Sequence, residues 1–341
     1  MRLVPTSKRL ACIAMVFVAA GACGGASGAS DAGGPSTNPP GGSNDAGGDA
    51  APIATGTPDA GAPSDAGHPS DASLPLDAGN VAGPALPTPS GTCPVFANGA
   101  VTFSPSGIPP RGVQVYMSDA AKTMHGPLIF YWYATGSSAT LEPPYALGAT
   151  LASIEAAGGI VVAPDADPSA GAFEWFIVNG SPKLDDFVVA DEIVACAAQT
   201  TGIDTTHIHS MGMSAGALQT TAMSFLRSAY LASVATYSGG MPMGFSPQNE
   251  DPANKFAALI FDGGPTDNVF GIDFQAASQT YQATLKSAGH FAAICDHGMG
   301  HSIPTAAAPS VAQFFQANGF GVYPSPYVNG LPATFPAYCT L

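Results

Sequence analysis

The sequence predicts an α/β protein, with a mostly parallel, twisted β-sheet and helices on both of its faces. Short apolar segments typical of buried strands alternate with segments of helical periodicity from residue 110 onward. The run PLIFYWYA at 127–134 is apolar and aromatic throughout, as expected of a strand covered on both faces. Strands that alternate with helices pair in parallel, and active groups then gather at their carboxyl ends.

Each element follows from its own pattern. Residues 112–117 alternate as a strand does, and GIVVA at 159–163 is a short buried run. The helix predicted at 184–198 carries Asp185 and Asp186 in its first turn, where the helix dipole favours acidic side chains. Further strands are expected at 207–211, 232–236, 257–261 and 291–295, and further helices at 147–157, 214–227, 274–287 and 306–317.

Residues 1–23 have the features of an export signal. Basic residues precede an apolar segment, 10–20, that is too short to span a bilayer as a permanent helix. Residues 20–23 read AGAC, which resembles the lipobox of bacterial lipoproteins, although Ala20 stands where that motif usually has leucine. We therefore expect an exported protein. It is either a cell-envelope lipoprotein, anchored to the membrane by a lipid on Cys23, or a protein secreted after cleavage behind Ala22.

Residues 24–91 are expected to form a disordered linker, because Gly, Ala, Pro, Ser and Asp cannot bury enough apolar surface to offset the entropy of ordering. Residues 92–341 have the length of one large domain, which we expect to be the catalytic one. This part has 6 basic and 17 acidic residues, a net charge of −11, with no basic cluster. Nucleic acid is therefore not an expected partner.

Four cysteines fall in the predicted domain, an even number that in an oxidising compartment predicts two disulfides. Three pairings are possible. Cys196 falls late in a predicted helix, whereas Cys295 closes a strand at the opposite end of the sheet, which favours Cys93–Cys196 with Cys295–Cys339. A zinc site is the alternative, but the spacing has no CxxC or close Cys/His pair, so no metal is expected.

The segment GMSAG at 212–216 has the G-x-S-x-G pattern of a nucleophile elbow, between an apolar run and a helix-compatible run. A serine in such a turn stands clear of the sheet, and the helix N-terminus stabilises negative charge beside it. The two glycines leave room for neighbouring backbone. Ser214 is therefore the predicted nucleophile, and the backbone N–H of Ala215 is a predicted donor of the oxyanion hole.

A serine nucleophile needs a base, and the base needs a carboxylate to fix its tautomer and stabilise its charged form. Two later strands run into loops that offer these groups, DGGPTDNV at 262–269 and DHGMGHSIP at 296–304. Asp267 is the predicted acid and His301 the predicted base. The alternatives are Asp262 and Asp273 for the acid and His297 for the base.

These motifs together resemble α/β-hydrolase esterases related to polyhydroxybutyrate depolymerases and feruloyl esterases. The resemblance spans most of residues 110–320 and also rests on DDFVVADEI and SGG, which begin at 185 and 238. It implies the α/β-hydrolase fold and a Ser–His–Asp triad. In relatives the acid loop often reads HGxxDxxV, whose Asp matches Asp267, and the histidine of Gly-His-x-x-Pro matches His301. Asp262 stands where that loop has its histidine.

Relatives usually carry His-Gly at the bend after the strand at 127–134, where this chain has YATG. The second oxyanion donor is expected to be the backbone N–H of Tyr133 or Ala134. An apolar pocket is expected beside the nucleophile, because an aromatic loop follows the strand at 159–163 and flexible thioethers fill irregular pockets. The side chains expected to line it are those of Trp175, Met213, Met241 and Met243.

The predicted function is hydrolysis of extracellular carboxylic esters by a serine esterase that passes through an acyl-enzyme. The substrate is either a hydroxyalkanoate polyester or oligomer, or a feruloyl ester of a plant polysaccharide. No cofactor is expected, because the chain has no phosphate-cradling loop, dinucleotide fingerprint or cofactor-binding lysine. A peptidase of the same fold is one alternative, and a non-catalytic, lipid-anchored surface-binding protein is the other.

Overall fold

The computed structural model describes residues 83–247 and 250–341. The predicted export signal, Cys23 and residues 24–82 of the predicted linker lie outside these residues. Within them, nine strands form one sheet in the order β1-β2-β4-β3-β5-β6-β7-β10-β11. The strands are β1 (Gly99–Phe103), β2 (Arg111–Tyr116), β3 (Leu128–Trp132), β4 (Ile160–Pro164), β5 (Ile208–Met213), β6 (Ser233–Tyr237), β7 (Ala257–Asp262), β10 (Phe291–Asp296) and β11 (Cys339–Thr340), with a separate hairpin of β8 (Asn268–Val269) and β9 (Ile272–Asp273).

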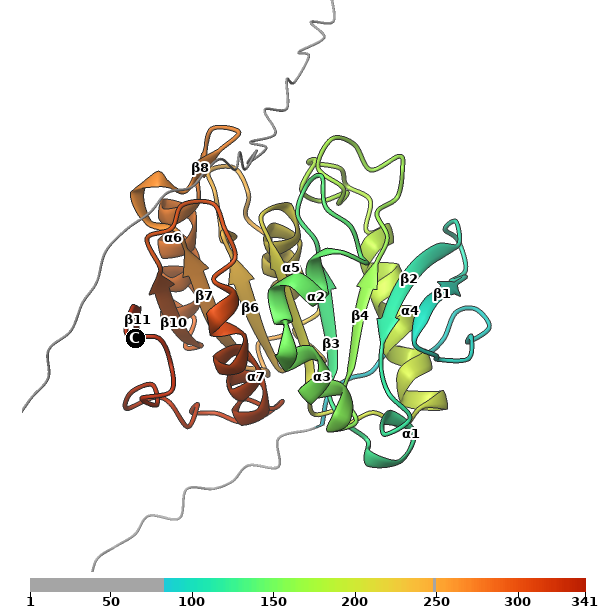
Figure 1. The fold of residues 1–341 in the computed structure, drawn as a ribbon. Coiled ribbons are helices and arrows are strands. Elements are labelled where there is room, and N and C mark those ends of the chain that lie inside the picture. The colour runs from blue at the N-terminus through green and yellow to red at the C-terminus, as the bar shows by residue number, and fades with distance from the viewer. Residues whose placement is uncertain (1–82, 248–249) are drawn as a thin grey trace, which may run out of the picture. The chain divides into compact units, whose positions relative to one another are not determined.

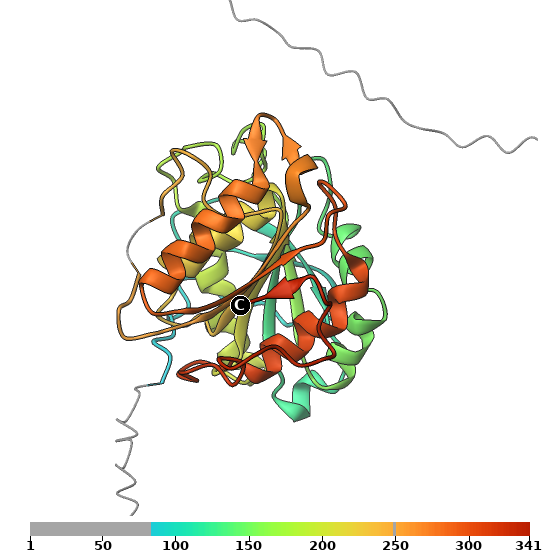
Figure 2. The same cartoon turned by 90° about the vertical axis from the view of Figure 1, so that its left-hand side faces the viewer.

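The strands from β4 to β10 in the sheet run parallel, and antiparallel pairing is confined to β1, β2 and β11 at the two edges. Helices cover both faces: α2, α3 and α7 lie on one side of the sheet, and α4, α5 and α6 on the other (Figures 1 and 2). The helices are α1 (Ala121–Met124), α2 (Glu142–Leu147), α3 (Ala149–Ala156), α4 (Asp185–Thr200), α5 (Ala215–Leu226), α6 (Phe274–Ser287) and α7 (Ala308–Ala317), with short 3-10 turns at Gly264–Thr266 and Thr305–Ala307.

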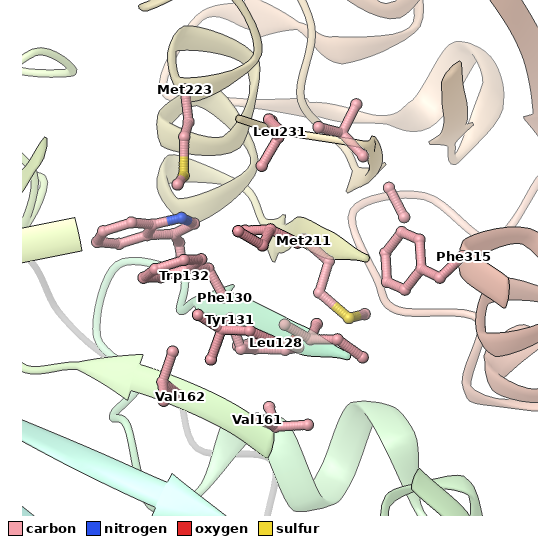
Figure 3. Close-up of a cluster of buried hydrophobic side chains, with 14 of the residues drawn as sticks. Leu128, Phe130, Tyr131, Trp132, Val161, Val162, Met211, Met223, Leu231 and Phe315 are labelled. Carbon is pink, nitrogen blue, oxygen red and sulfur yellow. The ribbon is translucent and has the colours of Figure 1, made fainter. Parts of the chain in front are cut away.

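The core lies on both faces of the central strands, which explains their uninterrupted apolar sequences. Every residue of β3 is buried. Trp132 faces α5, where its indole N–H donates to Ser210 Oγ at 3.1 Å, while Met211 of β5 extends to the other face, toward Phe315 of α7 (Figure 3). Each strand therefore supplies side chains to two apolar layers, as expected for a parallel sheet covered on both sides.

The predicted fold class is confirmed, and the predicted strands and helices are present with shifted ends. The sequence did not predict β1, the β8–β9 hairpin, β11, α1 or α2. Most of these elements are short, and α2 begins with two prolines after Glu142, a composition that helical periodicity does not reveal. Among the described helices, none has the length and apolar character needed to cross a membrane.

Both disulfides have the preferred pairing. Cys93 is bonded to Cys196 of α4, and Cys295 of β10 is bonded to Cys339 of β11. The segment just before Cys93 also contacts the domain, since the backbone N–H groups of Ser90 and Gly91 donate to the Glu192 carboxylate at 2.7 and 2.9 Å. Ordered contacts of the domain therefore begin before residue 92.

Candidate active site

Ser214 occupies the sharp turn between β5 and α5. Its backbone has φ 54° and ψ −119°, a conformation that non-glycine residues rarely adopt and that is typical of functional sites. The glycines on either side make the turn possible. A side chain at Gly216 would collide with the carbonyl oxygen of Trp132, and one at Gly212 would lie 2.5 Å from the same oxygen. The elbow thus brings the start of α5 against the end of β3.

The three residues predicted as nucleophile, base and acid lie within hydrogen-bond distance of one another. His301 Nε2 is 2.9 Å from Ser214 Oγ, and His301 Nδ1 is 2.7 Å from Asp267 Oδ1. A carboxylate only accepts, so Nδ1 carries the proton and Nε2 is left to accept from the serine hydroxyl. The side chain of Ser214 is nearly buried, with 8% of the residue exposed.

Asp267 is held as an ionised carboxylate by several donors. Its Oδ2 accepts from Ser238 Oγ and from the backbone N–H of Gly263, both at 2.8 Å. Burial alone would raise the pKa of Asp267, but the hydrogen bonds from His301, Gly263 and Ser238 outweigh burial and lower that pKa below its ordinary value. The carboxylate is therefore charged at neutral pH and oriented toward the imidazole.

Backbone hydrogen bonds join the loop that carries Asp267 to the loop that carries His301. They continue the pairing of β7 with β10 beyond the strand ends: His297 N–H donates to the Asp262 carbonyl and Gly300 N–H to the Gly263 carbonyl, both at 2.9 Å. A side chain at Gly263 would collide with the carbonyl of Gly300. The close approach of the two loops therefore requires this glycine, and this approach helps to set the distance between Asp267 and His301.

The alternative acid and base residues have other hydrogen-bond partners. Asp273 caps α6, where its Oδ1 accepts from Ala276 N–H at 2.9 Å. Asp262 is buried and accepts from Gly264 N–H at 3.0 Å, and burial together with neighbouring carboxylates raises its pKa to about 6. The Nδ1 atom of His297 accepts from Met299 N–H at 3.2 Å.

The backbone donors near Ser214 are only partly free. Ala215 is the first residue of α5, and N–H groups in a first turn have no acceptor within the helix. The N–H of Ala134, one of the two groups predicted as second donor, instead donates to both carboxylate oxygens of Glu142 at 3.1 Å. The other predicted donor, the N–H of Tyr133, stays a prediction; the carbonyl of the same residue accepts from the Trp175 indole at 3.1 Å.

A cavity of about 510 Å³ opens beside Ser214. Its described lining residues have no charged side chains, which suits an uncharged, largely apolar group. Phe173 and Phe270 meet edge to face over it, with ring centroids 5.5 Å apart. The other lining residues are Thr135, Ile177, Val178, Gly180, Ser181, Pro182, Ser214, Ala215, Leu218, Pro242, Met243, Gly244, Phe245, Ser246, Pro247, Ile272 and Phe274.

Of the four residues predicted to line the pocket, Met243 is among its described lining residues, and Trp175, Met213 and Met241 are not. Trp175 is fully buried beneath the loop, packed edge to face against Trp132 and Tyr133. Met213 is the last residue of β5 and is buried, and Met241 packs against the core. In the loop that contains Trp175, the side chain that lines the pocket is that of Phe173, two positions earlier.

The pocket wall after β4 is held by a buried ion-pair network. Arg111, 4% exposed, donates to Asp186 at 3.0 Å, to Asp167 at 3.2 Å and to the Asp165 carbonyl at 3.0 Å. Asp186 in turn accepts from the backbone N–H of Phe176 at 2.8 Å. One arginine thus ties β2, α4 and the loop that contributes Phe173 to the pocket. From the sequence, Asp186 was expected in the first turn of a helix, and nothing in the sequence indicates its ion pair with Arg111.

Among the described residues, one group has a spacing of donor atoms suited to a metal ion: Cys93, Glu192 and Cys196. Both sulfurs of this group are in a disulfide. Glu192 already accepts from the backbone of Ser90 and Gly91. We therefore interpret this cluster as structural.

No protein-family model and no curated protein matches this chain. Among solved structures, native sOPH is similar with a TM-score of 0.57 and 16% identity, over 75% of this chain and 96% of that one. Native pOPH is similar with a TM-score of 0.58 and 14% identity, over 73% of this chain and 96% of that one. A thermostable esterase is similar with a TM-score of 0.51 and 16% identity, over 64% of this chain and 62% of that one. At such identities the likeness shows the fold. The chain has the α/β-hydrolase fold.

Proposed function

We propose that this protein is a serine hydrolase of uncharged carboxylic esters. The observation that carries the proposal is the relay of two hydrogen bonds from Ser214 through His301 to Asp267, of 2.9 and 2.7 Å. Ser214 lies on a strained turn and lines a largely apolar cavity. The solved esterase of similar fold is consistent with this activity.

The geometry supports acyl transfer in two steps. Ser214 Oγ attacks the ester carbonyl carbon while His301 Nε2 takes the hydroxyl proton, which it then gives to the leaving alcohol. Water, activated by the same nitrogen, releases the acyl group and regenerates the serine. Asp267 holds His301 in the required tautomer and stabilises its charged form, which the lowered pKa of this carboxyl supports.

The cavity supports substrates whose bound part is neutral and apolar. Its volume of about 510 Å³ accommodates either a feruloyl group or a short hydroxyalkanoate oligomer. We propose these two classes as the substrates, following the resemblance to polyhydroxybutyrate depolymerases and feruloyl esterases. The hydrogen-bond relay alone serves esters and amides alike, so preference for esters is part of the proposal.

A panel of substrates tests the proposal. The purified chain should hydrolyse p-nitrophenyl butyrate, and either methyl ferulate or hydroxybutyrate oligomers, faster than a peptide amide. Ser214→Ala should lower kcat by about 10⁶-fold, since the nucleophile is then absent. Faster cleavage of the amide would instead identify a peptidase. If the folded protein hydrolyses none of these four substrates, the alternative of a non-catalytic surface-binding protein is favoured.

We further propose that the enzyme works outside the cytoplasm, anchored to a membrane through Cys23 or released. The two disulfides support an oxidising compartment. The anchor is proposed from the sequence of the first 23 residues. Incorporation of labelled fatty acid that disappears in Cys23→Ala would support the anchor, whereas wild-type protein without the label would favour release.

A further inference from the structure

We propose that the side-chain hydroxyl of Thr135 is the second donor of the oxyanion hole, and so a further catalytic residue. The inference rests on the ester hydrolase proposed above. It starts from a residue that lines the cavity beside Ser214: Thr135 Oγ1 is buried and has no hydrogen-bond partner among the described residues. A buried hydroxyl left unpaired costs about 1–3 kcal/mol of folding free energy. The cost is understandable if the hydroxyl acts when substrate is bound.

Thr135 lies where a second donor is needed. It lines the same cavity as Ser214 and Ala215. It follows β3, whose last residue, Trp132, is the register partner of Gly212 at the base of the elbow. In this fold the second oxyanion donor comes from the loop after that strand, and the first from the residue after the nucleophile.

The backbone N–H groups on either side of Thr135 already have carboxylate acceptors. The N–H of Ala134 donates to Glu142, and that of Gly136 donates to Glu174 Oε1 at 3.0 Å. Glu142 also accepts from the hydroxyl of Tyr131 at 3.1 Å, so its carboxylate anchors the loop to the strand below. An oxyanion could take either N–H only by displacing a carboxylate. The Thr135 hydroxyl needs no such exchange.

A rotation about χ1 is enough to bring the hydroxyl into use. Thr135 lines the cavity and is partly exposed although its Oγ1 is covered, so other atoms of the residue are accessible to solvent. A rotation of 120° between staggered wells moves the hydroxyl to the position of the methyl group, and the methyl group to the position of the hydrogen on Cβ. Because Oγ1 has no partner to lose, the rotation breaks no hydrogen bond.

The donor acts on charge that exists only after attack. When Ser214 Oγ bonds to the carbonyl carbon, the serine proton moves to His301 Nε2 and the π electron pair moves onto the carbonyl oxygen. That oxygen, now O⁻, accepts from the Ala215 N–H and the Thr135 hydroxyl. A donor used mainly in the transition state raises kcat and leaves substrate binding nearly unchanged.

The test compares two variants at this position. Thr135→Val keeps the shape and removes the hydroxyl, and Thr135→Ser keeps the hydroxyl. With p-nitrophenyl butyrate, Thr135→Val should lower kcat by about 10- to 1000-fold with KM within about threefold, whereas Thr135→Ser should keep most of kcat. The Tm of Thr135→Val should be equal to or above that of wild type, because an unpaired buried hydroxyl is removed.

Thr140→Val is the matched control. It makes the same chemical change in the same loop at an exposed residue, whose hydroxyl is 3.2 Å from Ser138 Oγ, and should leave kcat unchanged. Three results would overturn the inference: kcat of Thr135→Val within about twofold of wild type, an equal loss in Thr135→Ser, or a lowered Tm in Thr135→Val. None of these three results contradicts the proposed ester hydrolysis. That proposal is contradicted by a different result, namely that wild-type protein hydrolyses no ester.

Discussion

The two sides of the candidate site are held in place by different kinds of interaction. On the triad side, backbone hydrogen bonds from His297 and Gly300 join the loops that carry Asp267 and His301. On the pocket side, buried charged side chains hold the loops, with Glu142 under the bend after β3 and the Arg111 network under the wall after β4. A backbone contact does not depend on side-chain charge. A buried ion pair does, because one charge without its partner is strongly unfavourable.

We expect that removing the charge of Asp267 affects catalysis and leaves folding nearly intact. Asp267→Asn keeps the shape of the side chain but favours the wrong tautomer of His301, and kcat should fall by about 10⁴-fold. The backbone links between the two loops remain, so Tm should change little. Ester hydrolysis and thermal unfolding of the same preparation measure both effects.

Asp273→Asn is the control for that substitution. Asp273 is a nearby carboxylate that caps α6, and Asn caps helices about as well as Asp does. Its kcat should stay close to that of wild type. Similar losses of kcat in both variants would mean that general negative charge, and not the orientation of His301, is what matters.

On the pocket side, charge removal should instead lower stability. Arg111→Met leaves the buried carboxylate of Asp186 without its cation and should reduce the free energy of unfolding by about 3–5 kcal/mol. Adding Asp186→Asn to Arg111→Met should recover part of the loss, because the unpaired charge is then gone. Urea unfolding curves measure each variant.

Arg227→Met provides the comparison at a more exposed ion pair. Arg227 bonds Asp191 at 2.7 Å, and the two side chains are 19% and 27% exposed. Arg227→Met should lower the free energy of unfolding by about 1 kcal/mol, because water can still solvate the remaining carboxylate of Asp191. An Arg111→Met protein no less stable than Arg227→Met would show that the buried network does not hold the pocket wall.

A dependence of stability on pH sharpens the comparison further. Burial raises the pKa of Asp262 to about 6, above its ordinary value of 3.8. The fold therefore favours the protonated form, and this contribution to stability is present below about pH 4 and lost as pH rises through 6. Asp262→Asn cannot ionise, so it should exceed wild type in unfolding free energy by about 2–3 kcal/mol at pH 8 and by much less at pH 4. A gain independent of pH would contradict this reasoning.

The fold and the polar residues of the triad side could be predicted because their signals are local. The strands of the central sheet are continuous apolar runs. Ser214 directly follows β5, and Asp267 and His301 lie in the loops after β7 and β10. Parallel strands bring such residues to one edge whatever the details of packing. The short antiparallel edge strands have no comparable signal, and β1 and β11 were missed.

The pocket side could not be predicted because its contacts join residues far apart in sequence. Arg111 and Asp186 are 75 positions apart, and no pattern in either segment indicates the other. The Glu142 carboxylate accepts a hydrogen bond from Ala134 N–H because α2 folds back against the bend after β3. The prediction that the Ala134 N–H is free to bind an oxyanion was therefore wrong. Trp175 was placed in the pocket by its residue type, whereas its indole N–H is satisfied inward by Tyr133.

The most direct test of the central claim is to map where a fluorophosphonate attaches. The claim is that His301, oriented by Asp267, makes Ser214 a nucleophile. We predict one adduct, located on Ser214 by mass spectrometry of peptides, absent in Ser214→Ala and formed much more slowly in Asp267→Asn. A folded wild-type protein that stays unlabelled, or an adduct that persists unchanged in Ser214→Ala, would contradict the account.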